Sequence, residues 1–226
     1  MLREIAHFFR HAPGVAVMST RMSQAELFHL LSERADEAGV AAWRARLVEG
    51  LEDLTGEVLE IGCGTGLMFR HYPPGLNVVA TEYAPDFLGH AFVAAEASRA
   101  NITLELADAE ALAFESERFD VVVVSAVLCS VTSPKQALSE IRRVLKPGGE
   151  VRLMEHVRSP RPVPGALMHL VNPLWRLYNR QGCNLNRNTK ETLIAEGYEI
   201  MDCESFQVFA RGLPAFPSLL MRARPK

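Results

Sequence analysis

Three glycines near residue 60 form a segment that could hold a ligand against the protein backbone. Gly62, Gly64 and Gly66 follow the apolar stretch Glu57–Ile61, which its pattern predicts to be a strand. Glycine lets the chain turn sharply after a strand and lets its backbone approach a ligand closely. A dinucleotide-binding loop would need a third glycine at the position of Leu67, so that interpretation has little support.

Two acidic residues follow the next two predicted strands. Glu82 lies 20 positions after Gly62, at the end of the predicted strand Asn77–Thr81. An acid at this position can accept hydrogen bonds from the hydroxyls of a ribose. Asp108 follows the predicted strand Ile102–Ala107. Either residue could be an ordinary loop acid, but their occurrence together with the glycine segment favours a ligand-binding role.

His156 is the first candidate for a proton acceptor. It lies directly after the predicted strand Glu150–Glu155, and open α/β sheets bind ligands beyond the carboxyl ends of their strands. A hydrogen-bonded structural histidine is an equally good interpretation, and Glu155 could be the acid itself or could orient His156. The other histidines have no such placement and are expected to be surface or packing residues: His7, His11, His29, His71, His90 and His169.

Cysteine and serine side chains could line the same edge of the sheet. Cys129 and Ser130 follow the predicted strand Phe119–Ser125, although Cys129 is also typical of a small buried hydrophobic residue. Cys183 could contact a substrate or pack within a lid, and packing is the favoured interpretation. No CxxC pair occurs and no histidine lies at metal-ligand spacing, so we expect reduced thiols and no metal site for the four cysteines: Cys63, Cys129, Cys183 and Cys203.

Strands and helices alternate along the chain, as a parallel sheet requires. Right-handed crossovers between such strands place helices on both faces, so we predict a Rossmann-like, doubly wound α/β fold. Helices are expected at about 66–72 and 85–99, from Pro134, and at about 189–196. The predicted strands are 57–61, 77–81, 102–107, 119–125, 150–155 and 198–204.

Two further segments complete the predicted organisation of a single domain, residues 23–226. Ser23 and Glu26 have capping-box spacing, so one or two helices are expected to form an N-terminal cap ending near residues 55–56. Residues 1–22 are expected to be a tail or lid. Residues 157–188 form an insertion with Trp175 beside a helical stripe, which predicts either a lid over a pocket or a helix packed on its own sheet. The stripe consists of Leu167, Leu170, Val171, Leu174 and Tyr178.

Composition excludes several classes of protein. The chain has 226 residues, of which 48% are hydrophobic and 23% are charged, as is typical of a globular domain with a buried core. Its net charge of −3 provides no basic stripe for nucleic acid. No apolar run reaches the roughly 18 residues of a spanning helix. We therefore expect a cytoplasmic protein.

The glycine segment and the acid that precedes it resemble those of class I S-adenosylmethionine-dependent methyltransferases. The resemblance implies a seven-stranded sheet, with S-adenosylmethionine as cofactor and S-adenosylhomocysteine as product. It places an acid after the third strand at the adenine amino group, with a backbone contact from the next residue. The implied cofactor-binding residues are Glu60, Gly62, Cys63, Gly64, Gly66, Glu82, Tyr83, Asp108, Ala109 and Ser125.

Three shorter motifs make the resemblance more specific. VLCSV (127–131), EHV (155–157) and GCNL (182–185) occur here in the order typical of the alkyl-thiol methyltransferases and their bacterial relatives, together with EIGCGTG, YPPG and RRVLKPGG. The resemblance implies methyl transfer to a small aliphatic thiol or hydrogen sulfide. The candidate catalytic residues are then His156 and Glu155, and the candidate acceptor contacts are Cys129, Ser130, Trp175 and Cys183.

Two other functions remain open at this stage. One is O- or N-methylation of a secondary metabolite, quinone or phospholipid headgroup, and the other is cofactor binding without catalysis. The sequence also departs from the family: animal members carry an N-terminal hydrophobic anchor with no counterpart here, and Glu82 occurs where aspartate is commoner. We expect a small-molecule acceptor, no nucleic-acid partner, no stable membrane anchor, and a monomer or homodimer.

Overall fold

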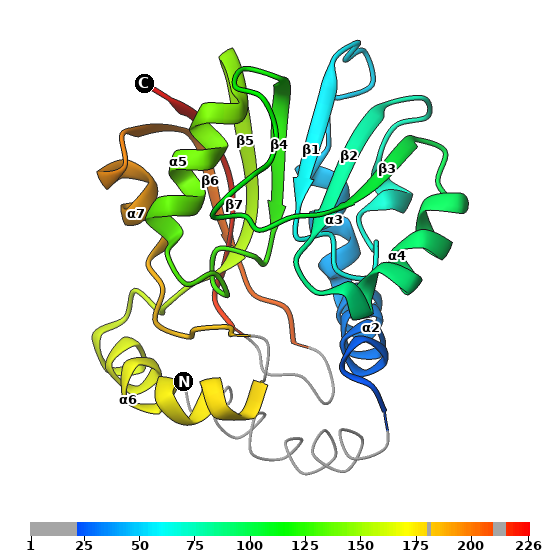
Figure 1. The fold of residues 1–226 in the computed structure, drawn as a ribbon. Helices are drawn as coiled ribbons and strands as arrows, with labels where there is room; N and C mark the ends of the chain where they lie inside the picture. The colour runs from blue at the N-terminus through cyan, green and yellow to red at the C-terminus, as the bar shows by residue number, and fades with distance from the viewer. Residues whose placement is uncertain (1–21, 180–181, 210–215) are drawn as a thin grey trace.

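A seven-stranded sheet forms the centre of the molecule (Figure 1). The computed structural model describes residues 22–179, 182–209 and 216–226. The strand order is β3-β2-β1-β4-β5-β7-β6, and only β7 runs antiparallel to its neighbours. The predicted seven-stranded, doubly wound sheet is therefore confirmed. The strands are β1 (Glu57–Ile61), β2 (Asn77–Glu82), β3 (Asn101–Leu106), β4 (Phe119–Ser125), β5 (Leu145–His156), β6 (Tyr198–Phe206) and β7 (Ser218–Pro225).

Both faces of the central strands are covered by helices. In β4, Val122 and Val124 pack with the side chains of helix α5 (Pro134–Val144), whereas Val121 and Val123 belong to the cluster on the opposite face. That second face is covered by α3 (Ala41–Leu47) and α4 (Pro85–Glu96). The unbroken valine run of β4 is thus explained by burial on both sides of a parallel sheet. Helix α7 (Thr189–Ala195) packs beside β6.

The sheet order places the glycine segment at the point where the strand order reverses. β1 lies between β2 and β4, so the chain leaves β1 in one direction along the sheet and later returns to its other side. Ligands of open α/β sheets bind at such a switch point, beyond the carboxyl ends of the strands. The ends of β1, β2, β4 and β5 are therefore the expected edge for the active site.

Two predicted helix boundaries are wrong. The N-terminal helices, α2 (Gln24–Ala35) and α3, are joined by the turn Asp36–Val40, and α3 ends at Leu47 rather than near residues 55–56. The predicted capping box of Ser23 and Glu26 is present at the start of α2. The helix predicted at about 66–72 is reduced to a single 3₁₀ turn, Phe69–His71, because the glycines before it take up the chain reversal.

Helix α6 (Pro162–Asn179) occupies most of the insertion, but its apolar stripe is not packed on the sheet. Leu170 and Leu174 are 76% and 70% exposed, and Leu167 is exposed as well. The interpretation of this stripe as the face of a helix packed on its own sheet is therefore wrong. Asn172 faces inward instead and is buried. The predicted tail or lid, residues 1–22, lies outside the described residues except for Met22. None of the described helices has the length and apolar character needed to span a membrane.

Candidate active site

The loop after β1 has the close-packed backbone expected of a ligand cradle. Gly62, Gly64 and Gly66 have φ angles of +67°, +57° and +81°, a region that side chains other than glycine rarely adopt. A Cβ atom at Gly64 would lie 3.1 Å from Phe28 Cε1, and one at Gly62 would lie 2.5 Å from a methyl carbon of Val127. Added side chains would fill the space around the loop, so the residues present fit a ligand held by backbone atoms.

Glu82 at the end of β2 fixes this loop in place. Its carboxylate accepts hydrogen bonds from the backbone N–H groups of Gly64, Tyr83 and Ala84, each at 2.9 Å. A carboxylate offers about four acceptor positions, so one remains for a ribose hydroxyl. Glu82 can therefore hold the loop and a ligand at the same time. The Tyr83 side chain is largely exposed at the same edge.

The two residues predicted near the adenine follow β3. One carboxylate oxygen of Asp108 accepts a 2.9 Å hydrogen bond from the backbone N–H of Glu110, which orders the turn. The Asp108 side chain is exposed, whereas Ala109 is buried. Because Ala107 N–H donates to the Glu82 carbonyl, this turn is tied to the end of β2. The two acids predicted to hold the cofactor are therefore brought to one edge.

Glu60 and Ser125 lie among protein partners below the loop. The buried Glu60 carboxyl accepts a 2.8 Å hydrogen bond from the Tyr72 hydroxyl, and burial raises its pKa to about 7. The Ser125 hydroxyl accepts a 3.0 Å hydrogen bond from Arg44 of α3. The structure thus gives both residues a role in supporting the floor of the site, and their predicted contact with the cofactor stays a prediction.

The raised pKa of Glu60 predicts a specific pH dependence of stability. An unburied glutamate titrates near 4.5, so the folded state favours the protonated carboxyl, and the resulting stability is lost as the pH rises through about 7. Glu60→Gln keeps a neutral group at this position. We expect the variant to match the wild type at pH 4.5 and to exceed it at pH 8 by about 3 kcal/mol in the free energy of unfolding. Chemical denaturation across this range measures the difference, and parallel profiles for the two proteins would contradict it.

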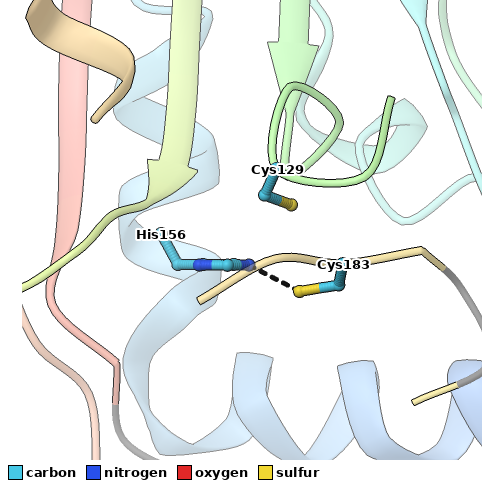
Figure 2. Close-up of side chains that lie close together, drawn as sticks. All are labelled: Cys129, His156 and Cys183. Carbon is cyan, nitrogen blue, oxygen red and sulfur yellow. Dashed lines mark hydrogen bonds between the residues drawn. The ribbon is translucent and has the colours of Figure 1, made fainter. Parts of the chain in front are cut away.

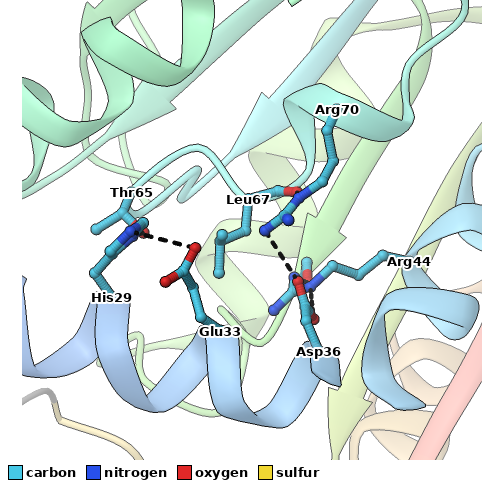
Figure 3. Close-up of polar contacts among 8 residues, drawn as sticks. His29, Glu33, Asp36, Arg44, Thr65, Leu67 and Arg70 are labelled. Atoms are coloured by element: carbon cyan, nitrogen blue, oxygen red, sulfur yellow. Dashed lines mark hydrogen bonds and ion pairs between the residues drawn. The ribbon is translucent and has the colours of Figure 1, made fainter. Parts of the chain in front are cut away.

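Helix α2 lies across the glycine loop and adds residues that the sequence did not point to (Figure 3). His29 Nδ1 is 2.9 Å from the Thr65 hydroxyl, so this partly exposed histidine contacts the glycine loop. Asp36, at the end of this helix, pairs with Arg44 at 2.8 Å and with Arg70 at 3.4 Å. The capping box and the helical period of the leucines after it predict α2, but neither signal says which loop the helix covers.

At the neighbouring strand ends, three separate segments bring Cys129, His156 and Cys183 together (Figure 2). Cys129 comes from the turn after β4, His156 ends β5, and Cys183 follows α6. The three ligand atoms, two Sγ and one imidazole nitrogen, lie within 4.8 Å of one another. His156 Nε2 is 2.8 Å from Cys183 Sγ. The predicted contacts Cys129 and Cys183 therefore share one site with the predicted catalytic histidine.

Glu155 fixes the position of this cluster. Its buried carboxylate accepts hydrogen bonds from the N–H groups of Val127, Leu128 and Cys129 at 2.7, 2.9 and 3.2 Å. Burial raises the pKa of Glu155, while these three donors oppose the rise. The carboxylate therefore orders the turn that carries Cys129, and the predicted roles of Glu155 as the acid or as the group that orients His156 stay predictions.

The GCNL segment is locked onto the same turn. Asn184 donates two hydrogen bonds to the Cys129 carbonyl, from its backbone N–H at 2.8 Å and from its side chain at 2.9 Å. Gly182 has a φ of +74°, and a Cβ atom there would lie 2.9 Å from the Ser130 carbonyl oxygen. Only glycine permits this approach, which explains why Cys183 reaches the cluster.

The surroundings of Cys183 favour the neutral form of its thiol. The hydrogen bond with Cys129 and burial both raise the pKa of the Cys183 thiol well above its usual range. Burial lowers the pKa of His156, but neighbouring Cys183 and the Glu155 carboxylate outweigh it, so the net shift is upward. His156 Nδ1 is buried and has no hydrogen-bond partner among the described residues.

Aromatic rings border the cluster on one side. Phe216 lies between His156 and Trp175, with ring centroids 5.4 and 5.3 Å apart. Ser130 Oγ is 3.5 Å from Cys129 Sγ, so each predicted acceptor contact lies near the cluster. Phe216 was not predicted, because it belongs to no recognisable motif and reaches the site only through the approach to β7. The expectation of no metal site rested on ligand spacing along the sequence, and such spacing does not reveal a cluster assembled from three separate segments.

The strand order 3-2-1-4-5-7-6 places a glycine loop at the switch point and an acid at the end of β2. These features define a class I S-adenosylmethionine-dependent methyltransferase. Comparisons with known proteins agree. A family profile described as "Methyltransferase domain" matches residues 59–153. An S-adenosylmethionine-dependent methyltransferase from Mesorhizobium loti shares the fold, with a TM-score of 0.60 and 22% identity over 82% of this chain and 98% of that one.

Two relatives are similar to this chain over most of its length, and the first of them shows its family. Human thiol S-methyltransferase TMT1B is 34% identical over 193 residues, which cover 78% of this chain and 74% of the relative. A demethylmenaquinone methyltransferase from Thermus thermophilus is 36% identical over 144 residues, 62% of each chain. The chain belongs to the family of S-adenosylmethionine-dependent methyltransferases that includes TMT1B. Its methyl donor is S-adenosylmethionine and its second product is S-adenosylhomocysteine.

Proposed function

We propose that this methyltransferase transfers the methyl group to the sulfur of a small thiol. One observation carries the proposal: the three motifs that distinguish the alkyl-thiol family converge on the cluster of Cys129, His156 and Cys183 at the acceptor edge of the sheet. The human and rat relatives named thiol S-methyltransferase TMT1B add support, because they match more than three quarters of this chain.

The surroundings of the cluster suit a neutral, apolar acceptor. The ring of Phe216 lies beside His156 and packs against Trp175, and the nearby carboxylate of Glu155 is occupied by backbone donors. A thiol has an unperturbed pKa of about 8.5, so it needs only modest help to become the reactive thiolate. An alcohol or amide nitrogen would need a stronger base than these residues offer.

The proposed division of roles follows from these contacts. S-Adenosylmethionine supplies a methyl group that is already activated by its sulfonium. The backbone of the Gly62–Gly66 loop, Glu82 and Asp108 hold and orient this cofactor. His156 helps the acceptor sulfur to lose its proton, and Glu155 positions the turn that carries Cys129. Much of the rate enhancement would come from alignment, since oriented reactants reach effective molarities of about 10⁵ M or more.

Methylation of a quinone precursor is the second candidate, because the Thermus thermophilus relative is named for that reaction. A mixed acceptor panel separates the two. Purified protein is incubated with S-adenosylmethionine and aliphatic thiols, hydrogen sulfide, a demethylmenaquinone, phenols or amines, and S-adenosylhomocysteine release is measured. We expect turnover with thiols and little with the other classes. Turnover with quinone, phenol or amine acceptors and none with thiols would reject the proposal.

A further inference from the structure

The site of Cys129, His156 and Cys183 is largely buried and brings together two thiols and an imidazole. This set of ligand atoms is typical of zinc sites. Zinc binds cysteine sulfur and histidine nitrogen, and sites with three protein ligands leave the fourth position of the tetrahedron for water or substrate. Cys129, His156 and Cys183 are the one group of this kind in the described part of the chain. We propose that these three residues bind a zinc ion, and that its open position receives the acceptor sulfur.

The distances are compatible with this proposal after a small adjustment. Zinc–sulfur bonds of about 2.3 Å and zinc–nitrogen bonds of about 2.0 Å put tetrahedral ligand atoms roughly 3.5–3.8 Å apart. The three ligand atoms lie within 4.8 Å of one another, so the widest pair has to approach by at most about 1.3 Å. His156 Nε2 and Cys183 Sγ, at 2.8 Å, have to separate by roughly 0.7 Å.

The backbone around each ligand is held independently of any metal. Glu155 and Asn184 fix Cys129, as described above. The Cys183 N–H donates to Asn179 Oδ1 at 3.2 Å, and Asn179 Nδ2 donates to the Cys183 carbonyl at 2.9 Å. His156 is the last residue of β5 and pairs with Ser218 of β7. Adjustment therefore requires movement of side chains only, and a site prepared in this way loses little entropy on binding.

Apart from contacts within the cluster itself, such as His156 Nε2 to Cys183 Sγ at 2.8 Å, the partners of Cys129 Sγ among the described residues are weak ones. Cys129 Sγ contacts the Ala126 carbonyl at 3.4 Å and the Ser130 hydroxyl at 3.5 Å, distances that denote weak bonds for a thiol. No ion pair from a lysine or arginine to the cluster occurs among the described residues. The lone pairs of two sulfurs and one imidazole are thus available to a soft cation.

If the acceptor is a thiol, as the proposed function requires, a metal at this position would stabilise its thiolate form. The acceptor S–H bond would break, its proton would pass to water, and the thiolate would bind the zinc ion. His156 would then assist the loss of the proton as a ligand of the metal rather than as a free base. The lone pair of the thiolate then forms the bond to the methyl carbon, while the carbon–sulfonium bond breaks and its electron pair stays on the sulfur of S-adenosylhomocysteine. No oxidant or reductant is required. The thioether product is uncharged and leaves the metal easily.

Metal binding can be tested without any acceptor. The full chain is stripped of metal with a chelator and then titrated with Zn²⁺ or Co²⁺. Two quantities are measured: the metal content after dialysis, and, for Co²⁺, the thiolate-to-cobalt charge-transfer absorption. We expect about one ion per chain, with X-ray absorption reporting two sulfurs and one nitrogen. Cys129→Ser and Cys183→Ser should each weaken affinity by at least about 100-fold. His156→Cys should retain the ion, and the control Cys203→Ser, on β6, should leave binding unchanged.

The outcomes separate this proposal from the thiol activity. Wild-type protein that binds neither ion tightly and shows no charge-transfer band would overturn the metal site, whatever the acceptor panel shows. The X-ray absorption ligand set of the wild type decides the question even where a serine variant fails to fold. A protein that binds one ion through these ligands yet methylates no thiol would keep the metal site and reject the proposed function.

Discussion

Gly64→Val is expected to lower the affinity for S-adenosylmethionine by about 100-fold or more, equivalent to ~3 kcal/mol. The backbone at Gly64 has a φ of +57°, which a β-branched residue adopts only with strain. A Cβ atom there would already lie 3.1 Å from Phe28, so the two further methyl groups of valine must displace this ring or occupy the ligand's space. The N–H of Gly64 also donates to Glu82, so a shift of the loop would disturb the proposed ribose contact.

A second glycine provides a matched control for backbone strain. Gly75 has a φ of +77°, and nothing lies within 4 Å of the position its Cβ would take. Gly75→Val therefore causes backbone strain similar to that of Gly64→Val, but its side chain lies away from the Gly62–Gly66 loop. Titration calorimetry of both variants and the wild type, with melting temperatures as a check of folding, measures the effect. Unchanged cofactor affinity in a folded Gly64→Val protein would show that the loop does not hold the cofactor.

His156→Ala is expected to reduce kcat/KM for thiols by roughly 100-fold at pH values below the pKa of the acceptor. In that range the acceptor is protonated, and the proposal requires His156 for loss of the proton. Above the acceptor's pKa the thiolate is present without assistance, so the difference between variant and wild type should narrow. Repeating the profile with thiols of different pKa should move the region of narrowing with the acceptor.

His169→Ala serves as the control for this experiment. His169 lies on α6 and contacts Asn186 at 3.1 Å in an exposed position, so its loss should leave the pH profile unchanged. Cofactor affinity, measured separately, should be retained in both variants, because no described contact joins His156 to the glycine loop. A loss of activity in His156→Ala that is equal at every pH would reduce His156 to a structural residue.

The order of elements was readable from the sequence because each buried strand is a short apolar run between turn residues. The valine run of β4 and the glycines after β1 are signals of this kind. Strand β7 was not located, since arginines alternate with apolar residues along it and no glycine motif marks its start. β5 begins earlier than predicted, because Leu145 already pairs with Phe119 before the irregular stretch at Pro147–Gly149.

The active site was only partly predictable, for a physical reason. Residues that follow a strand, such as Glu82, Cys129 and His156, could be assigned to the ligand edge from strand direction alone. The contacts of His29 with Thr65, and of Phe216 with His156, depend on how separate elements pack. Cys183 reached the cluster through Gly182 and Asn184, two residues whose partner, the turn after β4, is remote in sequence.

The order of strands in the sheet has a consequence for how such enzymes diversify. The residues assigned to the methyl donor come mainly from β1, β2 and β3, on one side of the switch point, and the cluster comes from β4, β5 and the segment after α6. The matched family profile ends at residue 153, three positions before His156. His156 and Cys183 thus lie beyond the matched segment, and Cys129 lies within it. A lineage can therefore exchange two of the three cluster residues, and with them the molecule it modifies, while inheriting the donor half unaltered.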